Sequence, residues 1–355
     1  MAYILNEKLK NLVPYSGSAG VYDVRLDANE SFLNPGELFK EELQAALLEM
    51  PLNRYPDPSC RKLREAFGKA YRIAPERVVA GNGSDELLSL LLGAFLQDDQ
   101  KLLTLEPDFS MYGVYAEIYG KQMVSMKKEN MEIHVDSVLE KMEREQADVL
   151  IFSNPCNPVS SVLKRDDVVR LIRSTDKLVI VDEAYMDFDS EDSVVDLAGV
   201  CDNLIVLKTC SKAWGCAGIR LGFAVSSEEI TGVLNALRSP YNVSSFTQAA
   251  GCVILNHAEY LQKAAEEMKV SAAKLYAGLL PLEKCGKVKR IRRSKTNFVF
   301  IETERADELH SALRERSILI RKTAGNLRIT AGTEEENRRV IEALFELFGE
   351  EREQK

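Results

Sequence analysis

The sequence predicts an α/β protein in which a seven-stranded, mostly parallel sheet forms a large domain beside a smaller α+β domain. Short runs rich in β-branched residues recur from Val78 to Val225, with helical stretches between most of them. Several of these runs are almost continuously apolar, which is typical of strands buried on both faces. After Pro240 a long helical stretch rich in Ala, Glu and Lys is followed by short strands. The first pattern predicts a parallel sheet covered by helices, and the second predicts a separate α+β unit.

The part of the chain before the large sheet is expected to contain two helices and little else that is regular. Residues 1–30 contain proline and glycine breakers, so they are expected to be irregular. Helices are expected at 37–50 and 59–71, on either side of a Tyr-Pro-Asp-Pro turn at 55–58. The predicted strands of the large sheet are 78–80, 101–105, 121–126, 149–153, 178–182, 204–208 and 221–225.

The C-terminal part predicts one long helix, four short strands and a closing helix. The long helix is expected at 246–280, and the closing helix ends near residue 348. The predicted strands are 288–292, 297–301, 318–321 and 327–330. These patterns place the large domain at 45–240 and assign 1–44 together with 241–355 to the small domain.

Composition excludes several classes of protein. Hydrophobic residues make up 45% and charged residues 28% of the 355 residues, which is ordinary for a globular chain. The net charge of −9 gives no general attraction to nucleic acid or anionic lipid, and no apolar run approaches the roughly 20 residues of a membrane span. Seven scattered cysteines without a Cys-x-x-Cys pair indicate reduced thiols in the cytoplasm. Three distant histidines argue against a metal site and a Ser-His-Asp hydrolase.

Two polar groups follow buried strands at the carboxyl edge of the predicted large sheet, where ligands of such sheets bind. The apolar run 178–181 ends in Asp182, and Lys212 follows another strand thirty residues later. Singly, a helix N-cap and a surface lysine would be the ordinary interpretations of these residues. Together they predict an acid and an amine that meet in one crevice.

An acid and a lysine in one crevice are what a pyridoxal phosphate site requires. The lysine amine forms a Schiff base with the aldehyde, and the carboxylate holds the pyridine proton so that the ring accepts electrons. Thr209, Ser211 and Arg220 lie near Lys212 in the sequence and are candidates to bind the phosphate. The sequence therefore predicts pyridoxal 5′-phosphate as the cofactor, with Lys212 and Asp182 as catalytic residues.

These residues carry a resemblance to a known family. With Ser211-Lys212, the Gly-Ile-Arg-Leu-Gly run at 218–222 and the Leu-Arg-Ile-Thr-Ala-Gly run at 327–332, the chain resembles the class I/II pyridoxal-phosphate aminotransferases of fold type I. Within them it most resembles the histidinol-phosphate aminotransferases. The resemblance extends over nearly the whole chain and implies the fold, cofactor and reaction of that family.

The turn Gly-Asn-Gly-Ser-Asp-Glu at 81–86 follows a predicted strand and opens a helix. Free backbone N–H groups at such a turn bind anions, and glycines let a phosphate approach. In the family this turn holds the cofactor phosphate, which implies that Gly83, Ser84 and Asp85 bind it here. A plain strand–helix turn is the alternative, because a glycine-rich turn alone is not specific.

The resemblance also implies residues around the cofactor ring. Phe109 takes the place of an aromatic residue, commonly tyrosine, that stacks on the ring, so stacking is expected without the hydroxyl. Asn157 lies in an Asn-Pro-Cys-Asn-Pro-Val-Ser run whose last two residues replace the family's Thr-Gly. It is expected at the cofactor 3′-oxygen and near the substrate carboxylate. Tyr185 is expected to reach the same 3′-oxygen and to act as a catalytic residue.

Substrate and subunit contacts are implied as well. Arg328 is expected to bind the substrate α-carboxylate as a planar fork. Tyr15 and Arg321 match positions that contact the substrate phosphate or line its pocket in histidinol-phosphate aminotransferases. Tyr55 resembles the tyrosine that reaches across a dimer interface to the partner's cofactor phosphate, so a homodimer with a shared active site is expected. Asn29-Glu30 resembles the N-terminal run that covers the substrate site, with no role assigned to either residue.

The expected reaction is transamination of L-histidinol phosphate with 2-oxoglutarate to imidazole acetol phosphate and L-glutamate, a step of histidine biosynthesis. Another class I/II aminotransferase, for aromatic or other amino acids, and a threonine-phosphate decarboxylase remain as alternatives on the same scaffold. A regulator with an aminotransferase-like domain is disfavoured, because the expected fold begins by about residue 15 and leaves no room for a DNA-binding domain. A nicotinamide-dependent dehydrogenase is disfavoured because the turn at 81–86 lacks the last glycine of Gly-x-Gly-x-x-Gly.

Overall fold

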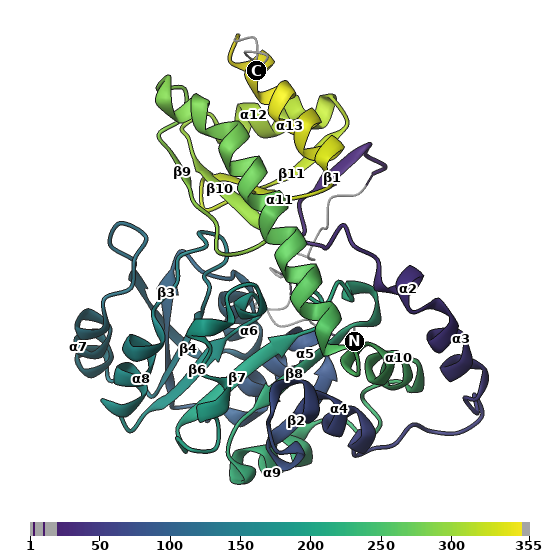
Figure 1. Cartoon of the computed structure of the whole chain (residues 1–355). Helices are drawn as coiled ribbons and strands as arrows, with labels where there is room; N and C mark the ends of the chain where they lie inside the picture. Colours follow the sequence, from purple (N-terminus) through teal and green to yellow (C-terminus); the bar gives the residue numbers. More distant parts are fainter. Residues whose placement is uncertain (1–2, 4–9, 11–19, 350–355) are drawn as a thin grey trace.

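Two β-sheets organise the chain in a computed structural model that describes residues 20–349 together with residues 3 and 10 (Figure 1). The long helix α11 (Ala258–Lys284) runs from the larger sheet to the smaller one (Figure 1). Its first half buries Ala264 and Met268 in the core of the larger sheet, and its second half buries Leu275 and Leu279 in the core of the smaller sheet. One helix therefore belongs to both cores. Among the described residues, no helix is both long and apolar enough to cross a membrane.

The larger sheet has seven strands within the described chain, and the seven predicted runs are confirmed as strands. The sheet order is β2-β8-β7-β6-β5-β3-β4, in which β8 is antiparallel to both neighbours and the other pairs are parallel. The strands are β2 (Val78–Asn82), β3 (Lys101–Glu106), β4 (Gln122–Lys127), β5 (Val149–Ser153), β6 (Leu178–Asp182), β7 (Leu204–Thr209) and β8 (Leu221–Val225). The prediction of a mostly parallel sheet is confirmed.

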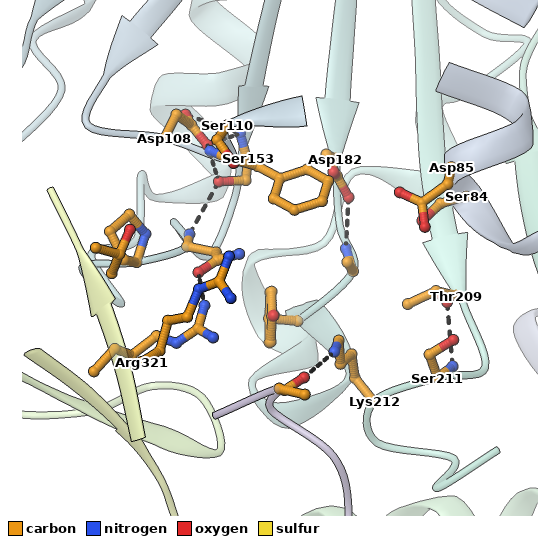
Figure 2. A pocket seen from close by; sticks show the side chains of 18 of the residues that line it. Ser84, Asp85, Asp108, Ser110, Ser153, Asp182, Thr209, Ser211, Lys212 and Arg321 are labelled. Atoms are coloured by element: carbon orange, nitrogen blue, oxygen red, sulfur yellow. Dashed lines mark hydrogen bonds between the residues drawn. The ribbon is translucent and has the colours of Figure 1, made fainter. Parts of the chain in front are cut away.

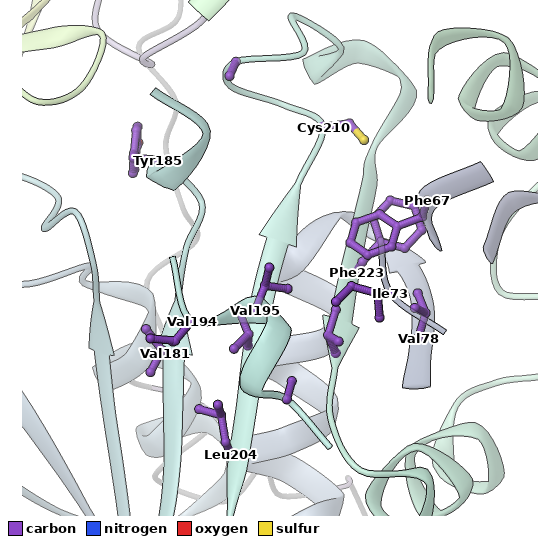
Figure 3. Packing of buried hydrophobic residues seen from close by; sticks show 14 of the residues in the cluster. Phe67, Ile73, Val78, Val181, Tyr185, Val194, Val195, Leu204, Cys210 and Phe223 are labelled. Carbon is purple, nitrogen blue, oxygen red and sulfur yellow. The ribbon is translucent and has the colours of Figure 1, made fainter. Parts of the chain in front are cut away.

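Alternate residues of the strands pack into two separate cores, one on each face of the larger sheet. On β6, Val179 and Val181 belong to one core and Ile180 belongs to the other. Figure 3 shows part of the first core, in which the Phe67 and Phe223 rings contact each other at a tilt, with centroids 4.2 Å apart. The helices that contribute to it include α4 (Arg61–Tyr71), α7 (Val135–Glu145) and α8 (Arg165–Arg173). The second core is covered by α5 (Gly83–Leu90), α6 (Met111–Tyr119) and α9 (Glu228–Leu237).

The smaller sheet has the order β1-β11-β12-β10-β9, with β1 parallel to β11 and the other pairs antiparallel. Its strands are β1 (Val24–Leu26), β9 (Arg290–Arg292), β10 (Phe298–Glu302), β11 (Ile318–Thr323) and β12 (Asn326–Thr330). One face packs its aliphatic residues on α11, α12 (Ala306–Glu315) and α13 (Glu334–Leu347). The capping box of Thr333 and Glu336 starts α13. Short helical turns span 75–77, 91–95, 186–188, 190–192, 195–197 and 217–219.

The expectation that residues 1–30 are irregular is wrong at β1. Val24 and Leu26 are buried in the core of the smaller sheet, and Arg25 between them is exposed. The strand pairs with residues 318–320, far away in the sequence. A run of three alternating residues carries too little periodicity to be recognised, and its pairing partner decides its conformation.

Two predicted helices are each interrupted. The stretch predicted at 246–280 consists of α10 (Ser245–Leu255) and α11, and the stretch at 37–50 consists of α2 (Pro35–Leu38) and α3 (Lys40–Leu48). Phe39 and His257, which stand at the two interruptions, stack with ring centroids 4.2 Å apart. A tertiary contact between the two segments therefore accompanies both breaks, and the local sequence of either segment does not reveal it.

Candidate active site

A cavity of about 230 Å³ opens where β5, β6 and β7 end, facing β11 and β12 of the smaller sheet. The predicted residues that line it are Ser84, Asp85, Phe109, Asn157, Asp182, Tyr185, Thr209, Ser211, Lys212, Arg220, Arg321 and Arg328. Figure 2 shows Ser84, Asp85, Thr209 and Ser211 on one side of Asp182 and Arg321 on the other. The cavity thus has one end rich in hydroxyl groups and another end that carries arginines.

Two predicted residues, Gly83 and Tyr55, are not among the described residues that line this cavity. Gly83 precedes Ser84 at the start of α5. Tyr55 is 80% exposed and stacks on Tyr241 with ring centroids 4.5 Å apart, away from the cavity of its own chain. Its role across a subunit interface stays a prediction. Tyr15 lies outside the described residues.

Asp182 lies at the end of β6 and is buried. Its Oδ2 accepts a 2.8 Å hydrogen bond from the Tyr112 hydroxyl, and its Oδ1 accepts one of 3.1 Å from Ala184 N. Burial raises the pKa of Asp182 to about 6, although both hydrogen bonds favour the charged form. The carboxyl is therefore mainly ionised at neutral pH and available to a cation in the cavity.

Lys212 lies in the loop that follows β7, and its Nζ donates a 2.8 Å hydrogen bond to the carbonyl oxygen of Ala28 (Figure 2). Burial, together with the nearby positive charge of Arg328, lowers the pKa of Lys212 to about 8. A lysine with this pKa has an appreciable neutral fraction at physiological pH. The side chain is therefore suited to nucleophilic attack on a carbonyl and to proton transfer.

The hydroxyl-rich end of the cavity is a cradle at the start of α5. Arg220 donates from Nη1 to Ser211 Oγ at 3.3 Å and from Nη2 to Asp85 Oδ2 at 3.2 Å. A side chain at Gly83 would place its Cβ 2.8 Å from Arg220 Nη2, and Gly83 has φ +75°, so glycine is favoured there. Free N–H groups at this helix start, the hydroxyls and the guanidinium together suit a phosphate group.

The opposite end of the cavity is built from Asn157 and two arginines of the smaller sheet. Arg328 donates from Nη1 to Asn157 Oδ1 at 2.5 Å and from Nη2 to the carbonyl oxygen of Asp27 at 2.7 Å. Arg321 lies opposite Arg328 in the register of β11 and β12. Two neighbouring guanidinium groups suit a carboxylate or a second phosphate.

Two aromatic residues complete the walls. Phe109 contacts Tyr112 edge to face, with ring centroids 5.6 Å apart. Tyr185 is buried, and its hydroxyl accepts a 2.8 Å hydrogen bond from Asn29 Nδ2. Burial raises the pKa of Tyr185, so its hydroxyl stays protonated and can act as a donor.

Sequence reasoning missed a polar cluster that holds the Asn157 loop. Asp108 accepts hydrogen bonds from Ser153 N at 3.2 Å and from Lys128 Nζ at 3.1 Å, and it also contacts Ser153 Oγ. Ser153 Oγ in turn accepts from Asn157 N at 3.1 Å. Asp108 comes after Pro107, which follows the end of β3. Its position as a polar residue just beyond a strand end was the one feature of the sequence that could have indicated a role in the site. The carbonyls of Asp27 and Ala28 could not be found from side-chain chemistry.

This donor set fits pyridoxal 5′-phosphate. Lys212 supplies an amine for the aldehyde, Asp182 a buried carboxylate for the ring nitrogen, and the cradle at α5 the donors for the phosphate. Phe109 supplies an apolar wall and Tyr185 a hydroxyl donor. A mostly parallel sheet with these groups at its carboxyl edge defines a pyridoxal-phosphate enzyme of the aminotransferase class.

Comparison with known proteins gives the family. The chain belongs to the family "Aminotransferase class I and II", whose model matches residues 20–344. It is 36% identical over 353 residues to the histidinol-phosphate aminotransferase of Clostridium kluyveri, covering 97% of this chain and 99% of the relative. It is 37% identical over 349 residues to that of Clostridium novyi, with 96% of each chain covered. The substrates of aminotransferases are amino acids and 2-oxo acids.

Solved structures share the fold. Histidinol-phosphate aminotransferase from Sinorhizobium meliloti in complex with pyridoxal-5′-phosphate is similar, with a TM-score of 0.87, 21% identity and 97% of each chain covered. L-threonine-O-3-phosphate decarboxylase from Porphyromonas gingivalis is also similar, with a TM-score of 0.78, 20% identity, and 92% of this chain and 100% of that chain covered. The prediction of fold type I is confirmed.

Proposed function

We propose that the protein uses pyridoxal 5′-phosphate to transfer the amino group of L-histidinol phosphate to 2-oxoglutarate, a step of histidine biosynthesis. The similarity to histidinol-phosphate aminotransferases over nearly the full length of both chains carries the proposal. The cavity supports it, because Asp182, Lys212 and the α5 cradle suit the cofactor while two arginines remain for an anionic substrate. We also infer a cytoplasmic location, since the cysteines at the described positions are all free.

The chain's own residues supply the binding and proton-transfer steps of this mechanism. When bound, pyridoxal phosphate supplies an electron sink for the electron pair left behind as the substrate Cα–H bond breaks. Asp182 holds the proton of the ring nitrogen, and Lys212 Nζ takes the Cα proton and returns it. Arg328 and Asn157 orient the substrate, and Tyr185 donates to the cofactor 3′-oxygen. Ser84, Ser211, Thr209 and Arg220 bind the cofactor phosphate.

The two substrates share one site, so the arginine-bearing end must accept both of them. Histidinol phosphate brings a phosphate and 2-oxoglutarate brings carboxylates, and a planar guanidinium binds either group through two parallel hydrogen bonds. Arg321 and Arg328 both line the cavity and are the residues we assign to this double task. Alternating use of one site predicts ping-pong kinetics.

Decarboxylation of threonine phosphate is the second candidate, because the Porphyromonas gingivalis enzyme shares the fold. An absorbance experiment separates the two. We would add L-histidinol phosphate, threonine phosphate or phenylalanine to the protein loaded with pyridoxal phosphate, with Lys212→Ala as the control. Conversion of the cofactor band by histidinol phosphate alone supports the proposal. Carbon dioxide release from threonine phosphate without an oxo acid supports the decarboxylase, and no cofactor band in the unmodified protein refutes both.

We further propose that the chain divides into a large domain at 45–240 and a small domain formed by 1–44 and 241–355.

We also propose that the protein is a homodimer. Exposed apolar side chains support a second copy as the occupant of the surface around α3, with Leu48 86%, Leu52 75% and Phe246 52% exposed. Tyr55 is 80% exposed on this surface and is the residue we assign to the partner's cofactor phosphate. Mixing Tyr55→Ala with Lys212→Ala subunits tests this, because only a mixed dimer contains one complete shared site. Recovered activity supports the shared site, and failure to recover it in verified mixed dimers refutes it.

A further inference from the structure

Three consecutive residues that follow β1 each contact a different candidate catalytic side chain. The carbonyl oxygen of Asp27 accepts from Arg328 at 2.7 Å, and that of Ala28 accepts from Lys212 at 2.8 Å. Asn29 Nδ2 donates to the Tyr185 hydroxyl at 2.8 Å. The first two contacts are made by backbone atoms, which any residue could supply. The third depends on the Asn29 side chain, which is 1% exposed.

The hydrogen bonds around Asn29 determine which end of its amide faces Tyr185. The hydroxyl oxygen of Thr330 accepts a 3.0 Å hydrogen bond from Asn29 N, and the Thr330 hydroxyl donates to Asn29 Oδ1 at 3.1 Å. In the opposite orientation of the amide, the Thr330 hydroxyl proton would lose this acceptor. The amide nitrogen is therefore the end that faces Tyr185, and it can only donate.

The backbone of Asn29 is also fixed in a specific conformation. Asn29 has φ +53°, in the left-handed region that asparagine tolerates better than most residues. Its carbonyl oxygen accepts a 3.1 Å hydrogen bond from Asn297 Nδ2. Because both the backbone and Oδ1 are held, the donor nitrogen has one direction, toward the Tyr185 oxygen.

We propose that Asn29 is a positioning residue that directs the hydroxyl proton of Tyr185 into the cavity. The Tyr185 oxygen accepts from Asn29, so its own proton is left to donate to another acceptor. On the proposed function, on which this inference rests, that acceptor is the 3′-oxygen of the cofactor. An acceptor at position 29 would instead attract the proton and turn it away from the cavity.

Two variants separate the polarity of this contact from its structural role. Asn29→Gly removes the side chain and keeps the left-handed backbone free of strain. Asn29→Asp keeps the shape but replaces the donor nitrogen by an acceptor oxygen and adds a negative charge. Ser31→Ala is the matched control, since Ser31 lies in the same segment and its Oγ accepts locally from Leu33 N. Each variant is also combined with Tyr185→Phe, and thermal unfolding shows which proteins are folded.

Two properties are measured besides activity: the affinity for pyridoxal phosphate, and the pH at the midpoint of the absorbance change of the bound cofactor. Charged groups that act on Tyr185 are Arg328, Lys212, Asp182 and Asp85, and all of them stay in place in these variants. Asn29→Gly is expected to weaken the affinity roughly three- to tenfold, because Tyr185 loses its hydrogen bond from Asn29. Asn29→Asp is expected to weaken it more and to move the midpoint, while Ser31→Ala leaves both unchanged.

The double variants decide the outcome. If Asn29 acts through Tyr185, either substitution at 29 changes the affinity by less than about twofold in the Tyr185→Phe background. Equal losses in both backgrounds, or no loss in either single variant, would overturn the inference while the unmodified protein still binds the cofactor. If the unmodified protein binds no pyridoxal phosphate, the proposed function fails together with the inference. The two failures are therefore distinguishable from the unmodified protein alone.

Discussion

The hydroxyl of Tyr112 donates a 2.8 Å hydrogen bond to Oδ2 of Asp182, and both side chains are buried. Tyr112 comes from α6 and Asp182 from the end of β6, so the packing of this helix on the sheet delivers the donor. Burial raises the pKa of Asp182 to about 6, and the Tyr112 hydrogen bond opposes that rise. Tyr112 therefore helps to keep the carboxylate charged at neutral pH.

Tyr112→Phe should raise the pH at which activity is lost on the acid side. Removing a donor that favours the charged form raises the pKa of Asp182, so a smaller fraction is ionised at any given acidic pH. In a plot of kcat against pH, the acid limb should move to higher pH by roughly one unit, which corresponds to about 1.4 kcal/mol in the ionisation of Asp182. The measurement is kcat between pH 5 and pH 8. Tyr119→Phe, on the same helix but exposed, is the control that should leave the limb unchanged. A limb that moves downward or stays in place would contradict this role for Tyr112.

The lowered pKa of Lys212 should give the cofactor-free protein a measurable pH dependence of stability. Its folded pKa of about 8 lies below the ordinary lysine value of 10.5. Between these two values the unfolded chain binds more protons than the folded one, so the free energy of unfolding rises with pH in this window. Below about pH 8 the buried charge costs its full amount.

Lys212→Met should therefore be more stable than the unmodified protein at pH 7, by roughly 1–2 kcal/mol after allowance for solvent in the open cavity. The advantage should shrink steadily as the pH approaches 10. Urea unfolding at a series of pH values measures it, with the exposed Lys40→Met as the control. If the stability advantage of Lys212→Met grew with pH, its pH dependence would have the wrong sign. That result would refute the conclusion that burial lowers the pKa of Lys212.

The ion pair between Lys128 and Asp108 should contribute strongly to stability, because both side chains are almost completely buried. Lys128→Met leaves a buried carboxylate without its cation, which costs about 3–5 kcal/mol. Adding Asp108→Asn removes the uncompensated charge, so the double variant should lose less than the sum of the two single losses, with a coupling of roughly 1–3 kcal/mol. Urea unfolding of the four proteins measures the cycle. Simple additivity would show that the pair does not act as a unit.

The larger sheet and the Asp182–Lys212 pair could be predicted because both depend on local patterns. Buried strands such as 149–153 and 178–182 are recognisable from continuous apolar runs, and polar residues at their ends mark the carboxyl edge. β1 could not be predicted, since a three-residue strand becomes regular only through its pairing with residues 318–320. The breaks at Phe39 and His257 were missed for a related reason, because these residues contact each other from distant segments.

Within the site, the residues that sequence reasoning missed hold other residues of the site in place. Asp108 holds the Asn157 loop through Ser153, and Tyr112 acts on Asp182. Asn29 was noticed in the sequence but could be given no role, because its partner Tyr185 lies 156 positions away. Such contacts require the packed structure, whereas residues that touch a ligand carry their chemistry in their own side chains.

Ser160 has a backbone φ of +65°, in the left-handed region that favours glycine. A residue other than glycine costs roughly 1–2 kcal/mol in that conformation. The Ser160 side chain offsets this cost: its Oγ accepts from Lys295 N at 2.8 Å and contacts Thr296 Oγ1 at 3.1 Å. These bonds tie the loop that carries Asn157 to the segment before β10.

Substitutions at Ser160 should therefore have unequal effects on stability. Ser160→Ala loses the hydrogen bonds and keeps the backbone strain, so it should lower the free energy of unfolding by about 1–2 kcal/mol. Ser160→Gly also loses the hydrogen bonds but relieves the strain, so it should be about as stable as the unmodified protein. Urea unfolding of the three proteins measures the order, and kcat/KM should follow it because Asn157 depends on the same loop. An alanine variant at least as stable as the glycine variant would show that the loop carries no strain at this position.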